Sequence, residues 1–436
     1  MTPPRSRKVS SRRRSVGFVT LGCPKNQVDT EIMQGILEDR GFRIVDPSHA
    51  DLVVVNTCGF IQDAQEESIE TVLSLISRGP VVVVGCLVER FGWELAKEIP
   101  EVETWLGLGA EHRIGEILER GEKGLFLEEA PPLSLGWWER RRLTTSPSAY
   151  LKLGEGCHNR CAYCAIPLIR GPLRSRPREE ILQEARLMLE AGVREINLIA
   201  QDLTAWGTDV GVENGLVSLL RELDSLPGEF WIRLLYLHPA GVTRELVRTV
   251  VNSRHVVPYL EMPIQHVDHQ VLEGMGRRGG ARAVERAVEL VDASGSIALR
   301  TTVLVGFPTE TEEAFQRLCR FLKNLSPWRL ACFGYSPQKG TPASNLVPLP
   351  EDEVRERVDE VLALAEELHW QSNLALVGKE LPFLVEGEGR GRIAFQAPEI
   401  DGVVHLEGAV TPEGFSTVRV EETDGVDLYA VPLCPR

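Results

Sequence analysis

Apolar residues form short Val-rich runs that alternate with amphipathic stretches through the first 130 residues of the chain. The three clearest runs are SVGFVTLGC, ADLVVVNTC and GPVVVVGC, which end at Cys23, Cys58 and Cys86. Between them, residues 27–40 and 63–76 repeat apolar side chains at helical spacing. Continuous apolar strands that alternate with helices indicate a parallel sheet covered on both faces. The pattern therefore predicts an N-terminal parallel α/β domain over residues 15–130.

Each of these three predicted strands stops at a cysteine: Cys23, Cys58 and Cys86. Right-handed crossovers bring the carboxyl ends of parallel strands to one edge of the sheet, where open α/β sheets bind ligands. Cysteines that lie 35 and 28 residues apart in the sequence are therefore expected to meet in space. The pattern predicts a three-cysteine cluster site. The alternative is three unrelated buried thiols, which leaves their position just past each strand unexplained.

A second run of alternating strands and helices follows a Pro/Ser-rich linker at residues 131–146. Six strands are readable in it: Ala149–Leu153, Glu195–Ala200, Trp231–Leu237, Pro258–Met262, Ala298–Val305 and Ala331–Tyr335. Six strand–helix repeats are too few for a closed eightfold barrel. We therefore expect a partial, open-sided (β/α)6 barrel over residues 147–375, with its chemistry at the carboxyl ends of the strands.

Beyond a long helix expected over residues 351–375, the pattern changes to short alternating runs separated by Gly-rich turns. This change predicts a small antiparallel β-barrel over residues 376–436. The module holds five Lys/Arg and eleven Asp/Glu, a net charge of −6, within a chain of net charge −15. An acidic surface attracts a basic partner and disfavours bare RNA. The alternative is that the acidic residues only keep the protein in solution.

Length and composition describe an ordinary globular chain of several domains. It has 436 residues, 43% hydrophobic and 25% charged, and no apolar run approaches the roughly 18 residues that span a membrane. Residues 1–14 are basic and polar, with no apolar segment behind them to make a signal peptide. We expect a disordered tail there; a basic arm that touches RNA is the alternative. Nine cysteines without a secretory signal point to a reducing, cytoplasmic compartment.

The segment GEGCHNRCAYCAIP places Cys157, Cys161 and Cys164 at the spacing C-x3-C-x2-C. A closed structural zinc site needs four ligands, and this run offers no fourth cysteine. Thiolates on a [4Fe–4S] cluster bind one iron each, so three of them leave one iron open. With Tyr163 just before the last cysteine, the segment resembles the radical S-adenosylmethionine (SAM) enzymes, in which the open iron chelates SAM. A zinc site or an inert thiol cluster is the alternative.

Three segments extend the resemblance to the whole chain: GCPKNQVDTE (22–31), TCGFIQDAQEES (57–68) and GCLVER (85–90). Together with the central motif, they resemble the methylthiotransferase family from about residue 15 onward. That family carries an N-terminal three-cysteine domain, a radical SAM barrel and a C-terminal TRAM barrel. The resemblance implies SAM and two [4Fe–4S] clusters, each with an open iron. The auxiliary cluster would sit on Cys23, Cys58 and Cys86, and the SAM-binding cluster on Cys157, Cys161 and Cys164.

Within the family, GCPKNQVDTE, TCGFI and APEIDG (397–402) resemble the branch that modifies an aspartate of small-subunit ribosomal protein twelve. Other branches modify an adenosine beside the tRNA anticodon and tend to read GC-x-MN in the first segment. The acidic barrel complements a basic ribosomal protein and disfavours tRNA. The proline in GCPKN departs from the small polar residue expected there and puts only the conformation of that loop in question.

The resemblance also implies the chemistry, since no side chain can attack an unactivated C–H bond. One electron cleaves SAM to a 5′-deoxyadenosyl radical, which takes hydrogen from the aspartate β-carbon. A sulfur methylated by a second SAM and held at the auxiliary cluster then couples to that carbon. Such an enzyme needs an electron donor such as flavodoxin or ferredoxin, and a sulfur source. A tRNA-adenosine methylthiotransferase and an iron–sulfur binding or assembly protein without turnover are the alternatives.

Other features give weaker signals, and beyond the cluster ligands the sequence identifies no catalytic residue. Gln201 and Gly306 fall at predicted strand ends where this superfamily contacts SAM; each is either a SAM contact or an ordinary turn residue. The two histidines within residues 263–269 are expected to be satisfied loop residues rather than catalytic ones. The arginines of residues 168–178 either meet a carboxylate of SAM or substrate, or flank a helix. Cys319 lies on an apolar helix face and is expected in the core.

Overall fold

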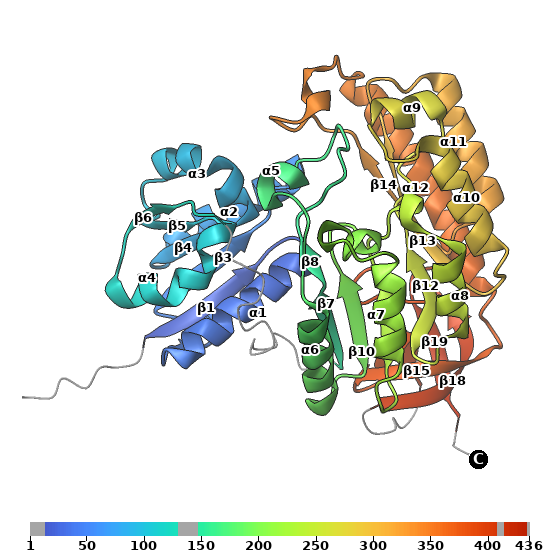
Figure 1. Ribbon diagram of the computed structural model, residues 1–436, viewed down its shortest axis with the longest axis horizontal. Helices are drawn as coiled ribbons and strands as arrows, with labels where there is room; N and C mark the ends of the chain where they lie inside the picture. The colour runs from blue at the N-terminus through green and yellow to red at the C-terminus, as the bar shows by residue number, and fades with distance from the viewer. Residues whose placement is uncertain (1–13, 130–146, 408–413, 434–436) are drawn as a thin grey trace, which may run out of the picture. The chain divides into compact units, whose positions relative to one another are not determined.

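The computed structural model describes residues 14–129, 147–407 and 414–433 (Figure 1). The chain divides into two units, residues 1–143 and 144–436, each of which has its own parallel sheet. The predicted linker and all but the last residue of the predicted basic tail lie outside the described residues. Among the described helices, none combines the length and the apolarity that crossing a bilayer requires.

The first unit is a six-stranded parallel sheet in the order β2-β1-β3-β4-β5-β6. Its strands are β1 (Ser15–Thr20), β2 (Arg43–Ile44), β3 (Leu52–Thr57), β4 (Val81–Gly85), β5 (Thr104–Leu106) and β6 (Gly124–Phe126). Its α-helices are α1 (Pro24–Asp39), α2 (Gln62–Ile76), α3 (Cys86–Glu98) and α4 (Ile114–Arg120). Val82 and Val84 of β4 belong to one apolar cluster and Val81 and Val83 to another, because neighbouring strand residues face opposite sides. The predicted parallel sheet covered on both faces is confirmed.

The second unit contains a six-stranded parallel sheet in the order β14-β13-β12-β11-β10-β7. Its strands are β7 (Ser148–Lys152), β10 (Glu195–Ile199), β11 (Trp231–Leu234), β12 (Val256–Glu261), β13 (Ala298–Val305) and β14 (Arg329–Gly334). Strands β7 and β14 are the two edges, so the barrel stays open and the predicted partial (β/α)6 architecture is confirmed. A two-stranded ribbon of β8 (Gly154–Glu155) and β9 (Arg174–Ser175) lies beside it.

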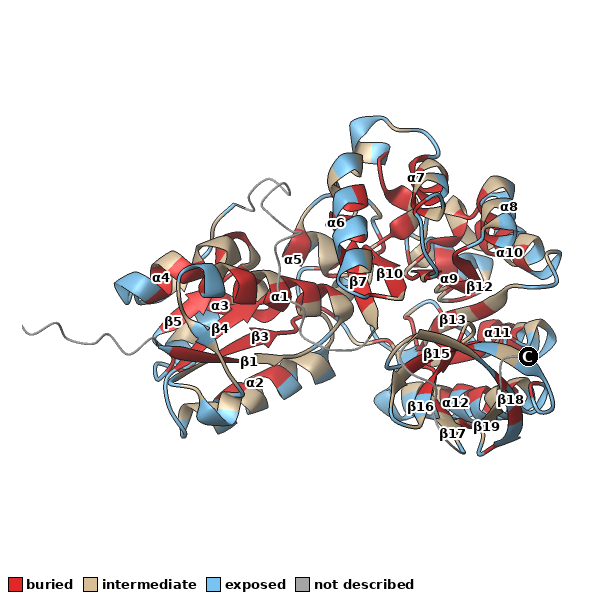
Figure 2. Ribbon diagram, turned by 90° about the horizontal axis from the view of Figure 1, so that it is seen from below, coloured by how far each residue is buried: buried red, intermediate tan, exposed pale blue. Residues whose placement is uncertain are grey.

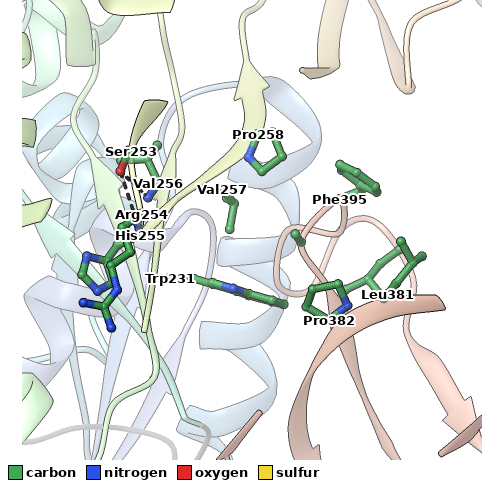
Figure 3. Close-up of a pocket in the computed structure, with 12 residues that line it drawn as sticks. Trp231, Ser253, Arg254, His255, Val256, Val257, Pro258, Leu381, Pro382 and Phe395 are labelled. Carbon is green, nitrogen blue, oxygen red and sulfur yellow. Dashed lines mark hydrogen bonds between the residues drawn. The ribbon is translucent and has the colours of Figure 1, made fainter. Parts of the chain in front are cut away.

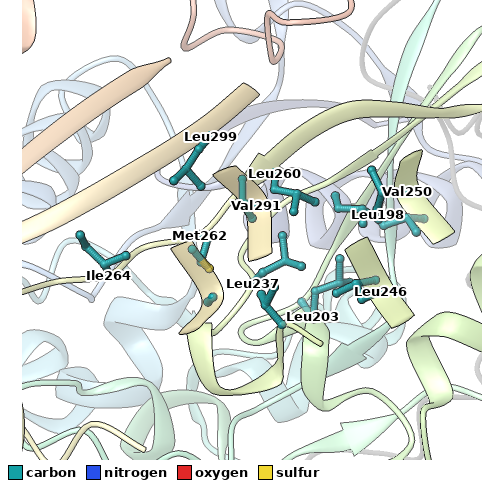
Figure 4. Packing of buried hydrophobic residues seen from close by; sticks show 14 of the residues in the cluster. Leu198, Leu203, Leu237, Leu246, Val250, Leu260, Met262, Ile264, Val291 and Leu299 are labelled. Atoms are coloured by element: carbon teal, nitrogen blue, oxygen red, sulfur yellow. The ribbon is translucent and has the colours of Figure 1, made fainter. Parts of the chain in front are cut away.

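Helices cover this sheet and bury its apolar face. They are α5 (Ile166–Arg170), α6 (Arg178–Glu190), α7 (Gly215–Asp224), α8 (Arg244–Asn252), α9 (His269–Gly274), α10 (Gly280–Asp292), α11 (Glu312–Leu325) and α12 (Glu351–Leu374). Leu260 of β12 and Leu299 of β13 pack in one core with Val250 of α8 and Val291 of α10 (Figure 4). Cys319 of α11 is 5% exposed within the same core, as its position on an apolar face predicts.

The chain ends in a closed five-stranded barrel in the order β15-β16-β17-β19-β18. Its strands are β15 (Glu380–Gly387), β16 (Arg390–Ile393), β17 (Val404–Leu406), β18 (Gly414–Thr423) and β19 (Leu428–Pro432). Alternate residues of the strands fill its interior, which Figure 2 shows as buried. The predicted small antiparallel barrel is confirmed, with the difference that β17 and β19 pair in parallel.

A buried charge network joins this barrel to the parallel sheet of the second unit. Glu195 at the start of β10 is fully buried, and its Oε1 accepts a hydrogen bond from Arg233 Nε of β11 at 2.8 Å. Its Oε2 pairs with Arg392 of β16, which also contacts Glu386 of β15. Arg233 Nη1 donates in turn to the carbonyl of Ala394 at 2.8 Å. Two arginines and two carboxylates thus neutralise one another between the two layers.

Asp401 makes a second junction, although its place in APEIDG suggests an exposed acidic loop. It is 2% exposed. Its Oδ2 accepts hydrogen bonds from Tyr259 Oη at 2.6 Å and from the Ala397 amide at 2.9 Å, and its Oδ1 pairs with Arg300. This carboxylate anchors the barrel to β12 and β13 and is not available to a basic partner. The neighbouring Glu399 is exposed.

Replacing Asp401 should destabilise the second unit strongly. Asp401→Ala leaves Arg300 without its carboxylate and the buried Tyr259 hydroxyl without its acceptor, which costs about 3–5 kcal/mol of unfolding free energy. The exposed neighbour gives a matched control, since Glu399→Ala should change that free energy by less than about 0.5 kcal/mol. Urea unfolding followed by circular dichroism measures both. Equal effects of the two substitutions would contradict the anchoring role of Asp401.

The Glu195 network should make the free energy of unfolding depend on pH in the acidic range. Burial alone would raise the pKa of Glu195, but the charges of Arg392 and Arg233 outweigh burial and hold that pKa at about 2. A lowered carboxyl pKa contributes stability that is present at neutral pH and lost as the pH falls from about 4.5 toward 2. Glu195→Gln should therefore be less stable than the native protein at pH 7, and the gap should narrow at pH 3. A gap of constant size in urea midpoints across this range would refute the assignment.

Candidate active site

The N-terminal cysteines follow three strands that neighbour one another in the sheet. Cys23 caps the start of α1 after β1, Cys58 directly follows β3, and Cys86 is the first residue of α3 after β4. Since β1 pairs with β3 and β3 with β4, all in parallel, the three loops emerge side by side at one edge.

Asn26 ties these loops together and lies between two of the thiols. Its Nδ2 donates hydrogen bonds to the carbonyls of Leu21 and Thr57, each at 3.0 Å. Its Oδ1 lies 3.9 Å from Cys23 Sγ and 3.6 Å from Cys86 Sγ. Just before α1, a Cβ added to Gly22 would come within 3.1 Å of the sulfur of Cys58. The short segment from Gly22 to Asn26 therefore borders all three thiols.

Each three-cysteine set has the donor chemistry of a four-iron site. Thiolates bind one iron each of such a cluster, so three cysteines can serve three of its four irons. A closed tetrahedral zinc site takes four protein ligands.

The second cysteine set lies on the loop after β8, held by backbone hydrogen bonds. The Cys157 amide donates to the carbonyl of Gly171 at 3.1 Å, and the Ala162 amide to the carbonyl of Met275 at 2.8 Å. Gly156 precedes the motif at φ +73°, and a Cβ there would lie 2.0 Å from the carbonyl oxygen of Pro172. Only glycine fits that close approach.

Arg277 places a fixed positive charge beside this motif. Its Nη1 lies 3.8 Å from Cys161 Sγ and 3.4 Å from Tyr163 Oη. Burial raises the pKa of Cys157, and it raises the pKa of Cys164 to about 12. Burial also raises the pKa of Tyr163, which keeps its hydroxyl neutral. The thiols of Cys157 and Cys164 therefore hold their protons at neutral pH.

Asp202 connects the cysteine loop to the carboxyl end of β10. Its Oδ2 accepts a hydrogen bond from Asn159 Nδ2 at 2.7 Å and lies 3.4 Å from Arg278 Nη2, and its Oδ1 accepts from the Thr204 amide at 3.0 Å. The preceding residue, Gln201, behaves differently. Both polar atoms of its amide are buried and have no hydrogen-bond partner among the described residues. A buried amide of this kind is suited to a ligand.

Gly306 directly follows β13 and serves the fold at that point. Its φ is +77°, and a Cβ would lie 2.6 Å from Val354 Cγ2 of α12. Its amide donates to Glu310 Oε2. These contacts account for glycine as a turn residue packed against a helix; contact with SAM remains a prediction.

The two histidines of residues 263–269 lie in different surroundings. His266 is buried; its Nδ1 accepts from the Asp268 amide at 2.9 Å and its Nε2 lies 3.3 Å from Glu310 Oε1. Both ring nitrogens are thus used, as expected for a satisfied loop residue. His269 is exposed and opens α9.

Three of the four arginines of residues 168–178 form ion pairs within the protein. Arg170 pairs with Glu155 Oε2 at 2.7 Å, Arg176 with Glu184 Oε2 at 2.7 Å, and Arg178 with Glu222 Oε1 at 2.6 Å. Burial alone would raise the pKa of Glu155, but Arg170 and Lys152 outweigh it and hold the pKa at about 2. Of the two interpretations of this segment, the structural one accounts for these three side chains.

An apolar groove of about 280 Å³ lies away from the cysteines, at the opposite edge of the same sheet. It opens where β11 and β12 begin and β15 and β16 of the barrel approach them, with Trp231, Pro258, Pro382 and Phe395 in its walls (Figure 3). Because chemistry in such barrels takes place at the carboxyl ends of the strands, we do not include this groove in the active site.

Known families match in three stretches. Residues 15–107 match uncharacterized protein family UPF0004, residues 151–322 the radical SAM superfamily, and residues 377–433 the TRAM domain. The chain is 42% identical to the ribosomal protein uS12 methylthiotransferase RimO of Moorella thermoacetica, over 95% of this chain and 98% of that protein. It is 39% identical to RimO of Thermotoga maritima, over 95% and 99% of the two chains.

The chain belongs to the RimO family of radical SAM methylthiotransferases. Its members transfer sulfur-containing groups, and this chain is an enzyme of that class. Among solved structures, the fold resembles the radical SAM methyltransferase TsrM of Kitasatospora setae, with TM-score 0.58 and 17% identity over 76% of this chain and 75% of that one. It also resembles OxsB, a cobalamin-dependent SAM radical enzyme, with TM-score 0.54 and 12% identity over 80% and 56%. At these identities the likeness concerns the fold alone.

In this RimO-family chain, Asn26 should be needed for iron retention by the N-terminal cysteines. Asn26→Asp keeps the shape of the side chain but removes the two hydrogen bonds that Nδ2 donates. It also places a negative carboxylate oxygen beside the carbonyl oxygens of Leu21 and Thr57, which repel it. In a Cys157/Cys161/Cys164→Ala background, where only Cys23, Cys58 and Cys86 remain, we expect the bound iron to fall well below about four atoms per chain. Iron analysis after anaerobic gel filtration measures it. Full retention of iron by Asn26→Asp would contradict this role.

Proposed function

We propose that this chain adds a methylthio group to the β-carbon of an aspartate in ribosomal protein uS12. The observation that carries the proposal is the presence of two three-cysteine sets in a RimO-family chain, one on three loops at the carboxyl edge of the first sheet and one on the loop after β8. Relatives named for action on uS12 match it along nearly their whole length. One set of cysteines suffices to bind SAM through an open iron, so the second set is available for sulfur delivery.

The proposal divides the work among the parts of the chain. Residues 15–130 hold an auxiliary [4Fe–4S] cluster on Cys23, Cys58 and Cys86. Residues 147–375 hold the SAM-binding [4Fe–4S] cluster on Cys157, Cys161 and Cys164, with Tyr163, Gln201 and Gly306 around SAM. Residues 376–436 form the TRAM barrel that meets the protein substrate.

When bound, the clusters supply the electron that cleaves SAM and the iron that holds sulfur. The chain itself supplies orientation and charge. Arg277 offsets the negative charge of the thiolate of Cys161. Hydrogen bonds to the sulfurs of such a cluster adjust its reduction potential. Asn159 and Asp202 hold the cysteine loop against the end of β10. The neutral hydroxyl of Tyr163 adds no negative charge beside these thiolates.

The exposed surface of the barrel suits a basic partner. Asp401 and Glu386 are occupied by arginines, yet other carboxylates on the barrel remain exposed: Glu380, Glu388, Glu399, Glu407, Glu421, Glu422 and Asp424. Such a surface attracts a basic ribosomal protein and disfavours tRNA. The proposal further includes an electron donor such as flavodoxin or ferredoxin, a sulfur source, and a cytoplasmic location, where uS12 and ribosomes meet.

The decisive experiment incubates the reconstituted protein with uS12, SAM, sulfide and a reductant, and measures the mass of uS12. The mass should rise by one methylthio group less one hydrogen, on an aspartate. Cys23/Cys58/Cys86→Ala should halve the bound iron and abolish this shift, yet still release 5′-deoxyadenosine from SAM. Cys157/Cys161/Cys164→Ala should abolish both. Methylthio-adenosine in tRNA, with uS12 unchanged, would replace the proposal with the tRNA function.

A further inference from the structure

His238 follows β11 and carries a buried hydrogen-bond donor that nothing described in the protein accepts. The side chain is 4% exposed. Its Nδ1 accepts a hydrogen bond from the Ala240 amide at 3.1 Å and caps a 3-10 turn over Pro239–Gly241. Burial, together with the charges of Arg277 and Arg278, lowers the pKa of His238 to about 2. The neutral ring therefore carries its proton on Nε2.

That Nε2–H has no partner within residues 147–407 or elsewhere in the described structure. Leaving a buried donor unpaired costs on the order of 1–3 kcal/mol. Two neighbouring loops contain atoms in the same state: the amide of Gln201 after β10 and the Nε of Arg277 after α9. His238 and Gln201 thus offer unpaired polar atoms, and Arg277 offers its Nε, while its two other nitrogens have partners. Such groups are suited to a polar ligand.

Contacts between these loops place the loops themselves side by side. The Leu203 amide, two residues after Gln201, donates to the carbonyl of Tyr236 at 2.9 Å. A Cβ added to Gly241 would lie 2.1 Å from Thr204 Oγ1, and one added to Gly279 would lie 3.4 Å from Ala240 Cβ. The loop of His238 thus lies between the loop of Gln201 and the loop of Arg277.

The backbone at this edge is also strained. Tyr236 after β11 and Gln265 after β12 are non-glycine residues with φ of +62° and +68°. Such conformations cost roughly 1–3 kcal/mol each and gather at ligand sites. Of the charged groups at this edge, Arg278 is paired with Asp202 and Glu261 accepts a hydrogen bond from the Tyr236 amide at 3.1 Å. Arg277 remains as the positive charge that a bound anion would meet.

We propose that His238, with the Gln201 amide and the Nε of Arg277, forms a carboxylate-binding site beside the Cys157–Cys164 loop. The assignment rests on the proposed function, which brings two carboxylates to this edge: the methionyl carboxylate of SAM and the side chain of the target aspartate. A histidine held neutral binds a carboxylate by donating one hydrogen bond. It cannot exchange a proton with that carboxylate, so it orients the ligand without competing with the radical chemistry.

Two substitutions separate the binding role of His238 from its structural role. His238→Asn keeps an acceptor near the position of Nδ1, and asparagine is a good N-cap, but it removes the donor at Nε2. His238→Gln places an amide donor near the position of Nε2. His255→Asn is the matched control, because His255 is a buried histidine at the opposite edge of the sheet with partners on both ring nitrogens.

The measurement is equilibrium binding to the anaerobically reconstituted protein, with SAM alone in one arm and uS12 in the other. His238→Asn should weaken one of them by about tenfold to a hundredfold, as expected for a lost hydrogen bond to a charged group. His238→Gln should stay within several-fold of the native affinity. His255→Asn should lower the melting temperature and leave both affinities unchanged.

The arms identify the source of the carboxylate. Weaker SAM binding with native uS12 binding assigns the methionyl carboxylate. If His238→Asn binds native uS12 more weakly than the native protein does, but both bind equally to uS12 whose target aspartate is replaced by alanine, the carboxylate is that of the substrate aspartate. Native affinities for both ligands in His238→Asn would overturn the proposal. Failure of the native protein to bind uS12 would instead refute the proposed function, and the SAM arm would still test the site.

Discussion

Parallel strands joined by right-handed crossovers leave all their carboxyl ends at one edge of a sheet, and the chemistry of this protein depends on that constraint. In the first unit it brings together cysteines from three separate loops, with Asn26 between two of them. In the second unit it places the end of β10 against the cysteine motif, where Asp202 accepts a hydrogen bond from Asn159. Arg277, which follows helix α9, reaches the same motif at Cys161.

The charged groups at the two ends of the second sheet have different partners. At the carboxyl edge, Arg277 lies beside thiols, and some donors keep no partner of their own. At the other edge, Glu195 and Asp401 are fully paired with Arg233, Arg392 and Arg300. The paired carboxylates join the barrel to the sheet, whereas the buried His238 and Gln201 keep polar atoms that a ligand could use. The same residue types thus serve stability at one edge and binding at the other.

Local pattern predicted the sheets, the barrel and the loops of the six cysteines, because strand ends and helical spacing are visible within short windows. It did not reveal β2, β5 and β6, which have only two or three residues and give no periodic signal. It also did not identify Arg277 or Asp202, whose partners Cys161 and Asn159 lie 116 and 43 residues away. Asp401 looked like part of an acidic surface because its partner Arg300 lies 101 residues earlier.

The paired charges between β10, β11 and β16 have a consequence for any truncation of this protein. Without the chain beyond residue 376, Glu195 would lose Arg392 and Arg233 would lose the carbonyl of Ala394. Tyr259 and Arg300 would lose Asp401 in the same step. The change of pattern near residue 376 is therefore a boundary in the sequence, but cutting the chain there would leave buried charges without partners.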